Sequence, residues 1–433
     1  MNNQLMAGVS RVNITPEIGG YLYGYNPNTI SDSINDDLTA TAVALAYGSI
    51  RVIIVSTTVC QVNTDLSNAI RKQIGEETSI PASNVIISVT HTHSGPRTNG
   101  TKGWGDIDTE YCNAIFIPRL IEVAKEAINN LKPAKLGIGT TESLVGINRR
   151  QYGADGITLL GQNPWGYFDK TMTVLSLKGK DDTAIANIIH YGAHCTAAGN
   201  NTEISRDWAG VMIDRLEKET GAVTAFLNGA EGDVGPRLTN GGTTGNINYA
   251  MEHGAVAAQD ALRAYKSIKE YHNVSLDYVT DKISLPYGPR IPLAEAEEKI
   301  KKLTNTTVNT GGLQYYFLSN VIASYKAGEI EKTHMEYQQT IIRLGQVVII
   351  PFPFEMFSEM SIRLREYSPY THTLCLSNTN GSMGYLPSQD QICRGGYEIE
   401  VFLHQNVQPL TNDADNHIIN ENLRILKAMT HSG

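Results

Sequence analysis

Short runs of β-branched apolar residues recur along this chain and alternate with longer stretches of helical periodicity. Each run has the length of a buried strand and is too short to span a membrane. Alternation of strand and helix predicts an α/β fold with a mixed β-sheet core and flanking helices. The expected strands are residues 51–55, 84–89, 186–190, 223–227, 346–350 and 373–376. The expected helices are residues 64–75, 109–131 with a kink at Pro118, 208–220, 251–268, 293–303 and 315–327.

The length of 433 residues is large for one compact core and allows either one large domain or two closely packed lobes. No internal repeat divides the sequence. A polar, strand-like stretch and a helix rich in Lys and Glu follow one another near residues 270–335. We therefore predict a single domain over residues 1–433, in which residues 270–335 are a candidate for an inserted lobe.

Charge and cysteine content exclude several classes of partner. The net charge of -9 includes no basic stripe, so nucleic acid and anionic membranes are poor partners, and a small-molecule or lipid-like substrate is expected. The five cysteines show no CxxC spacing, which argues against a disulfide framework and against a thiolate zinc site. No run is long enough for a transmembrane segment, and residues 1–8 do not resemble a secretory signal, so a cytoplasmic location is expected. The sequence does not determine the oligomeric state.

Polar side chains of metal-binding type repeatedly follow the expected strands. His91 and His93 follow strand 84–89, His194 follows 186–190, Glu355 follows 346–350, and Tyr385 lies beyond 373–376. Loops that leave the carboxyl ends of strands in α/β proteins converge on one rim. The sequence therefore predicts a site at the carboxyl ends of the strands.

The histidines each allow a structural alternative. In an extended segment His91 and His93 share a face, so one can bind a metal while the other contacts substrate. Two partly exposed histidines in a turn would give the same pattern, and alone the motif is weak. His190 and His194 have i, i+4 spacing, but Gly192 between them favours a strand leaving into a loop. We select His194 because it lies further beyond the strand; a purely structural histidine is the alternative.

The carboxylate and the tyrosines are also open to other interpretations. Glu355 follows Pro351 and Pro353, which force an extended exit from the strand, and it can be a metal ligand or a helix N-terminal charge. Glu359 is the competing acid. Tyr385 and Tyr397 follow glycine turns, and each is by itself better explained as a packed aromatic residue.

Taken together, these segments resemble the N-terminal catalytic domain of the neutral/alkaline ceramidases, a family of zinc amidases. Their order along the chain is the order found in that family: residues 7–16, the His91 element 91–96, 148–149, 232–236, the Glu355 element and the Tyr385/Tyr397 segment. The resemblance implies Zn²⁺ held by His91, His194, Glu355 and Tyr385, with His93, Arg149 and Tyr397 facing the substrate. It also implies an amide cleaved by metal-activated water, with His93 moving a proton and with Tyr397 and Arg149 donating to the oxyanion.

The sequence departs from the family in three respects. Gly235 occupies the position of a serine in the family's Gly-Asp-Val-Ser-Pro element, which excludes a serine nucleophile there. Neither a C-terminal immunoglobulin-like domain nor a secretory signal is recognised. We therefore expect a zinc-dependent amidase whose substrate is smaller and more soluble than ceramide. The alternatives are a zinc-dependent esterase or lactonase acting on a small, carbohydrate-derived substrate, and a binding homologue without turnover. A metallophosphatase is least favoured, since its metal site would need several aspartates.

Overall fold

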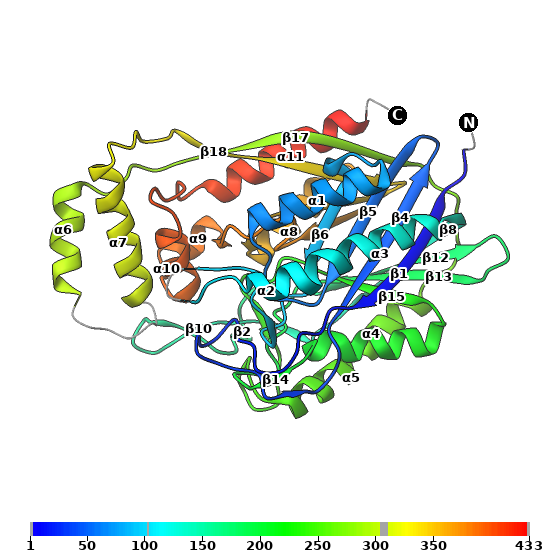
Figure 1. Ribbon diagram of the computed structural model, residues 1–433, viewed down its shortest axis with the longest axis horizontal. Helices are drawn as coiled ribbons and strands as arrows, with labels where there is room; N and C mark the ends of the chain where they lie inside the picture. Colours follow the sequence, from blue (N-terminus) through cyan, green and yellow to red (C-terminus); the bar gives the residue numbers. More distant parts are fainter. Residues whose placement is uncertain (1–2, 102–103, 304–310, 431–433) are drawn as a thin grey trace.

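The computed structural model describes residues 3–101, 104–303 and 311–430, and its core is formed by two large β-sheets packed face to face with helices outside them (Figure 1). The larger sheet contains, in spatial order, β15 (Val223–Asn228), β13 (Ala184–Tyr191), β12 (Thr171–Gly179), β8 (Lys132–Glu142), β1 (Met6–Asn13), β4 (Thr39–Tyr47), β5 (Ile50–Thr57) and β6 (Val85–Val89). The smaller sheet contains β17 (Leu276–Pro286), β18 (His334–Leu344), β19 (Val347–Pro351) and β21 (His372–Leu376). The expected mixed α/β fold is confirmed.

Within these two sheets, three pairs of neighbouring strands are parallel: β5 with β6, β13 with β15, and β19 with β21. Parallel neighbours need a crossover connection, and a helix supplies it in each case. These crossover helices are α1 (Thr64–Thr78), α4 (Asp207–Thr220) and α8 (Ser358–Tyr367). The fold thus contains three β-α-β units, and loops leave the carboxyl ends of six strands.

Alternation of side chains along the strands explains the layers. In β5, Ile53 and Val55 pack with the helices α1 and α3 (Ile117–Asn129), whereas Val52 and Ile54 pack against the smaller sheet. The helices α4 and α5 (Ile247–Lys266) cover the other half of the larger sheet. The outer face of the smaller sheet packs against α8 and α11 (Ala414–Thr430), so the order of layers is α/β/β/α.

Two glycines let helices approach the sheet closely. A Cβ atom at Gly8 in β1 would lie 2.2 Å from the backbone oxygen of Ala127 in α3. One at Gly139 in β8 would lie 1.9 Å from the backbone oxygen of Ala264 in α5. Both separations are far below van der Waals contact, so only glycine permits this packing.

The expected elements all occur, with differences at their ends. The helix expected over 109–131 is interrupted: α2 (Thr109–Tyr111) passes through a π-helical turn at Cys112–Phe116 into α3, which has Pro118 in its first turn. The missing N–H of Pro118 is tolerated there. No helix of the described residues is long and apolar enough to cross a bilayer.

Residues 270–335 include much of a long arm that extends from the smaller sheet. The strands β17 and β18 pair along their whole length, and α6 (Leu293–Lys302) and α7 (Gly311–Lys326) lie between them in sequence and at one end of the molecule (Figure 1). Part of the expected lobe, residues 304–310, lies outside the described residues. The arm shares the sheet of β19 and β21, and its treatment as a separate lobe stays a prediction.

Replacement of Gly8 with alanine tests the contact between β1 and α3. We expect Gly8→Ala to lower the free energy of unfolding by about 1–3 kcal/mol or more, because the added methyl group meets backbone that cannot rotate away. The control is Gly20→Ala, where the nearest atom to an added Cβ is 3.9 Å away, and it should change stability by less than about 0.5 kcal/mol. Equal denaturant midpoints for the two variants would contradict the packing argument.

Candidate metal centre

The loops that follow the paired parallel strands converge at one place. From the first β-α-β unit come Cys60, Gln61 and His91; from the second comes His194; and from the third comes Glu355. The side-chain ligand atoms of His91, His194 and Glu355 lie within 4.8 Å of one another, and all three residues are buried. Side chains far apart in sequence therefore form one cluster.

His91 lies two residues beyond the end of β6 and has a strained backbone conformation. Its φ of 66° is in the left-handed region, which a residue with a side chain rarely occupies and which costs about 1–3 kcal/mol. The Nδ1–H group of His91 donates to the backbone oxygen of Cys60 at 2.7 Å. This bond leaves the Nε2 atom, with its lone pair, directed at Glu355, 3.6 Å from Oε2. The backbone at His91 is thus in the left-handed region, where the sequence suggested an extended strand.

His194 is held in the same way. Its Nδ1–H group is within hydrogen-bond distance of two backbone oxygens, at 2.9 Å from Glu231 and 3.1 Å from Val234. The indole of Trp208 donates to the backbone oxygen of His194, which fixes the main chain. The Nε2 atom of His194 then lies 3.2 Å from Oε2 of Glu355.

A short parallel ladder brings Glu355 and Tyr385 side by side. The strand β20 (Glu355–Met356) pairs with β22 (Tyr385–Leu386), and Glu355 is directly opposite Tyr385 in the register. The hydroxyl of Tyr385 lies 3.4 Å from Nε2 of His194. Gln61 donates to the other carboxylate oxygen of Glu355 at 2.8 Å, so Oε2 is left facing the histidines.

The donor set fits a zinc ion. Ligand atoms at about 2.0–2.2 Å from a tetrahedral centre are about 3.3–3.6 Å apart, close to the separations of 3.2 and 3.6 Å found between Glu355 and the two imidazoles. Hydrogen bonding of the second ring nitrogen to a carbonyl is typical of metal-binding histidine. Without a cation, two unprotonated nitrogens and a carboxylate oxygen would face one another as acceptors.

Burial sets the charges of these groups. It lowers the pKa of His91 and, together with the nearby guanidinium of Arg149, lowers the pKa of His194 to about 3. Burial alone would raise the pKa of Glu355, but the opposite effect of His91 and His194 is larger. The pKa is therefore lowered, and the carboxylate is ionised. Burial raises the pKa of Tyr385 well above its ordinary value, against the opposing effect of Arg149. The cluster therefore presents two neutral imidazoles and one carboxylate near pH 7.

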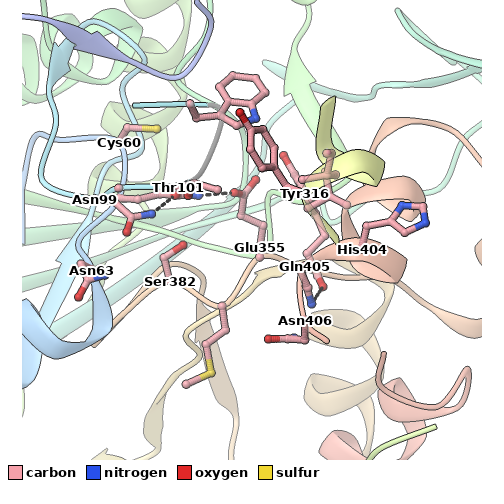
Figure 2. Close-up of a pocket in the computed structure, with 18 of the residues that line it drawn as sticks. Cys60, Asn63, Asn99, Thr101, Tyr316, Glu355, Ser382, His404, Gln405 and Asn406 are labelled. Atoms are coloured by element: carbon pink, nitrogen blue, oxygen red, sulfur yellow. Dashed lines mark hydrogen bonds between the residues drawn. The ribbon is translucent and has the colours of Figure 1, made fainter. Parts of the chain in front are cut away.

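A cavity of about 610 Å³ opens onto this cluster, and Figure 2 shows Glu355 among the side chains that line it. The lining also includes His91, His93, Tyr385 and Tyr397. Its volume is in the range of small-molecule sites. The Nε2 atoms of His93 and His91 are 3.3 Å apart, and the rings of Tyr397 and Tyr385 are 5.9 Å apart. His93 and Tyr397 thus both lie at the cavity beside the candidate ligands.

The sequence resemblance implies that Arg149 faces the substrate, but in the structure Arg149 lies away from the cavity. It does not line the cavity and lies behind Tyr385, to whose hydroxyl it donates at 2.8 Å. Its Nε–H group donates to Glu398 at 2.8 Å, and Arg150 donates to the other oxygen of Glu398 at 2.7 Å. Glu398 therefore compensates two buried guanidinium groups, and Arg149 is placed to orient Tyr385.

His190 and Glu359, the alternatives to His194 and Glu355, lie outside the His–His–Glu cluster. His190 Nε2 is 2.9 Å from the backbone oxygen of Cys375, and Glu359 is a partly exposed residue of α8 near Arg363. The sequence analysis did not identify three residues that surround the cluster: Gln61, Glu231 and Asn378. Gln61 donates to Glu355, and Asn378, beside His91, donates to Glu231 at 2.8 Å. All three follow a buried strand, so the rule that found His91 and Glu355 also marks them. Glu398 lies in a helix and does not follow a strand, so this rule does not mark it.

Gly235 is packed rather than open. It lies in β16 (Val234–Pro236), and a Cβ atom there would meet the Cβ and Cγ2 atoms of Thr243 at 2.7 Å. Neither Gly235 nor Thr243 lines the cavity. A serine at 235 would have to displace Thr243, and no group from this position reaches the cavity.

The fold and the cluster define an α/β protein with a buried His–His–Glu site of metal-binding geometry. The chain belongs to the neutral/alkaline non-lysosomal ceramidase family, since the model of that family's N-terminal part matches residues 5–259. The candidate ligand Glu355 and the tyrosines 385 and 397 lie beyond the matched segment.

Comparisons with individual proteins agree with this assignment. The chain is 30% identical over 175 residues to neutral ceramidase B of Dictyostelium discoideum, an alignment that covers 35% of this chain and 24% of that protein. The chain therefore matches about a quarter of the length of this curated relative.

Two solved structures share the fold. One is a ceramidase complexed with C2, with a TM-score of 0.75 and 17% identity over 100% of this chain and 76% of that one. The other is the neutral ceramidase of Pseudomonas aeruginosa, with a TM-score of 0.72 and 17% identity over 99% and 75%.

Removal of the negative charge of Glu398 should be strongly destabilising. Its side chain is 1% exposed and pairs with both Arg149 and Arg150. We expect Glu398→Gln to lower the free energy of unfolding by about 3 kcal/mol, because two buried guanidinium groups lose their counter-charge. Glu400→Gln, on the same helix at a side chain that is 42% exposed, should cost less than about 0.5 kcal/mol. Similar unfolding curves for the two variants would refute this role of Glu398.

Proposed function

We propose that this protein is a zinc-dependent hydrolase that cleaves an amide C–N bond with an activated water molecule. The observation that carries the proposal is the set of three acceptor atoms, His91 Nε2, His194 Nε2 and Glu355 Oε2, directed at one point in the cavity wall. Membership of the ceramidase family supports amide hydrolysis. Tyr385 is the candidate fourth ligand. When bound, Zn²⁺ would act as a Lewis acid and make water nucleophilic near neutral pH.

The protein's own side chains then divide the remaining work. Gln61 and the backbone oxygens of Cys60 and Glu231 hold the candidate ligands in place. His93 is neutral because burial and the neighbouring His91 and His194 lower its pKa, so it can accept a proton and deliver it to the leaving nitrogen.

The developing oxyanion needs a hydrogen-bond donor at the cavity wall. Burial raises the pKa of Tyr397, so its hydroxyl stays protonated and is available to donate. Arg149 contributes indirectly, by donating to the hydroxyl of Tyr385. This division assigns substrate contact to His93 and Tyr397 and a positioning role to Arg149.

Metal analysis tests the ligand set. We expect His194→Asn to lose stoichiometric zinc, because an amide is a poor substitute for an imidazole donor. The matched control is His190→Asn, since His190 is also a buried histidine and its Nε2 atom is within hydrogen-bond distance of a backbone oxygen, outside the His–His–Glu cluster. Zinc is measured by elemental analysis in folded samples of both variants, and only His194→Asn is expected to lack it. Retention of zinc by His194→Asn would remove this residue from the site.

Kinetics test the role of Tyr397. Loss of one oxyanion donor typically lowers kcat by about 10²–10³-fold, and we expect a decrease of this order in Tyr397→Phe with little change in KM or zinc content. Tyr337→Phe is the control, because the Tyr337 hydroxyl is buried without a hydrogen-bond partner in the described residues. An unchanged kcat in Tyr397→Phe would assign the tyrosine a packing role.

Esters and lactones pass through a similar tetrahedral intermediate, so a panel of matched amides and esters separates the amidase from the esterase proposal. The absence of metal-dependent turnover on every substrate would favour a binding homologue. Location in the cytoplasm stays a prediction, which fractionation of the source cells tests.

A further inference from the structure

Exposed apolar side chains concentrate in one short segment of the chain, residues 150–167, which we call the apolar hairpin. The large apolar residues that it exposes are Tyr152, Ile157, Leu159, Leu160, Tyr167 and Trp165. Trp165 is 94% exposed, the highest value among them. Single exposed apolar residues are common on protein surfaces, but a cluster of this kind marks a contact surface.

The strands of the apolar hairpin hold these side chains outward. β10 (Arg150–Tyr152) and β11 (Thr158–Leu160) form a two-stranded antiparallel ladder that belongs to neither of the two large sheets. Leu159 and Leu160 are neighbours in β11, so they point to opposite faces of the ladder, and both are more than half exposed. The ladder therefore projects from the molecule with apolar side chains on both of its faces.

The loop after β11 is fixed by hydrogen bonds and presents two aromatic rings. The backbone N–H of Trp165 donates to the side-chain oxygen of Asn163 at 3.2 Å, and Asn148 donates to the backbone oxygen of Tyr167 at 3.0 Å. The rings of Trp165 and Tyr167 remain largely exposed. Tryptophan and tyrosine are enriched at membrane–water interfaces, because each combines an apolar ring with one polar N–H or O–H group.

The charge of the apolar hairpin excludes an ionic partner. Asp155 is the only charged residue among residues 151–168. One guanidinium, that of Arg394, lies over the ring of Tyr152 at 5.1 Å from its centroid. One negative and one positive group give the surface no net attraction for anionic lipids, nucleic acid or a charged protein.

The size of the apolar hairpin favours a lipid surface over a protein partner. A stable protein–protein interface uses about 20–30 residues on each side, far more than this projecting segment exposes. A small, ordered and uncharged apolar element instead suits insertion among zwitterionic headgroups, where the strength of binding follows the apolar area that is buried.

The apolar hairpin also adjoins one wall of the cavity. The hydroxyl of Thr158 donates to the backbone oxygen of Arg394 at 2.8 Å, and a Cβ atom at Gly396 would lie 3.0 Å from the Cβ atom of Thr158. The helix α10 (Tyr397–His404) begins directly after Gly396, near β10, and three of its side chains line the cavity (Figure 1). A lipid surface that holds the hairpin would therefore lie beside this cavity wall.

We propose that the apolar hairpin binds the surface of a zwitterionic lipid bilayer and inserts Trp165 and its apolar neighbours among the headgroups. This proposal goes beyond the hydrolase proposal, because it concerns a binding surface and requires neither metal nor turnover. The cavity beside the hairpin is suited to such a position, since an apolar chain leaving the bilayer would meet an apolar wall. The side chains of that wall are Leu313, Phe317, Met335, Met383 and Val401.

Flotation of the full chain with phosphatidylcholine vesicles tests the proposal. We expect the wild type to bind and Trp165→Ser to lower the partition coefficient about tenfold, the usual effect of losing one large buried apolar side chain. Tyr167→Ser should lower it about fivefold. The matched control is Tyr367→Ser, which should bind as the wild type does. Tyr367 is 66% exposed and Tyr167 65%, but Tyr367 lies at the end of α8.

Fluorescence and salt give two further readouts. Vesicles should shift the emission of the wild type to shorter wavelength, brominated phosphatidylcholine should quench it, and Trp165→Ser should remove most of both effects. Trp208 is buried, so it contributes a constant background. Because no ion pairs are involved, high salt should leave binding unchanged.

Three results would overturn the proposal: no binding to the vesicles, equal effects of Tyr167→Ser and Tyr367→Ser, or binding that high salt abolishes. Self-association of the chain that Trp165→Ser abolishes would assign the hairpin to a second copy and would also overturn it. The test is independent of the hydrolase proposal, since the zinc-site variant His194→Asn should bind vesicles as the wild type does. Conversely, hydrolysis of a soluble amide should be the same in Trp165→Ser as in the wild type.

Discussion

The hydrogen bonds from the Nδ1 atoms of His91 and His194 to backbone oxygens are the interactions on which the site depends. Each bond fixes one tautomer and leaves a lone pair on Nε2 directed at Glu355. The accepting carbonyls belong to Cys60 and Glu231, in loops that leave neighbouring strands of the same β-α-β units. The orientation of the ligands is therefore a consequence of the sheet topology, which holds each imidazole loop beside the loop that supplies its acceptor.

Compensation of buried charge extends this arrangement outward. Glu355 is a buried ionised group, and Gln61 satisfies the oxygen that does not face the histidines. Behind Tyr385, two arginines share the single carboxylate of Glu398. Isolated buried charges are costly, but paired and hydrogen-bonded ones hold a unique geometry. The strained φ of His91 is maintained because these surrounding contacts leave it no alternative position.

Sequence patterns revealed the strands and ligands that carry strong local signals. β-branched runs such as those of β6 and β19 were recognised, and the polar residues after them led to His91 and Glu355. In contrast, β4 consists largely of Ala and Thr and β8 contains Gly137 and Gly139, so neither shows a hydrophobic pattern. The structure explains the glycines of β8, because the helix α5 packs directly on Gly139, and Ile268 and Tyr271, which follow α5, pack on Gly137. The position of Arg149 behind Tyr385 likewise depends on tertiary packing, which local spacing does not encode.

The candidate ligands and the walls of the cavity come from different structural sources. The ligand loops belong to the three β-α-β units, whereas Tyr316 belongs to α7 in the arm between β17 and β18, and Gln405 and Asn406 follow α10 (Tyr397–His404). Side chains of the arm do not contribute to the His–His–Glu cluster, so they can change without disturbing the ligand geometry. Separation of this kind allows one reaction centre to serve different substrates. The lining of this cavity therefore bears on the substrate separately from the family assignment, which rests mainly on the part of the chain that carries His91 and His194.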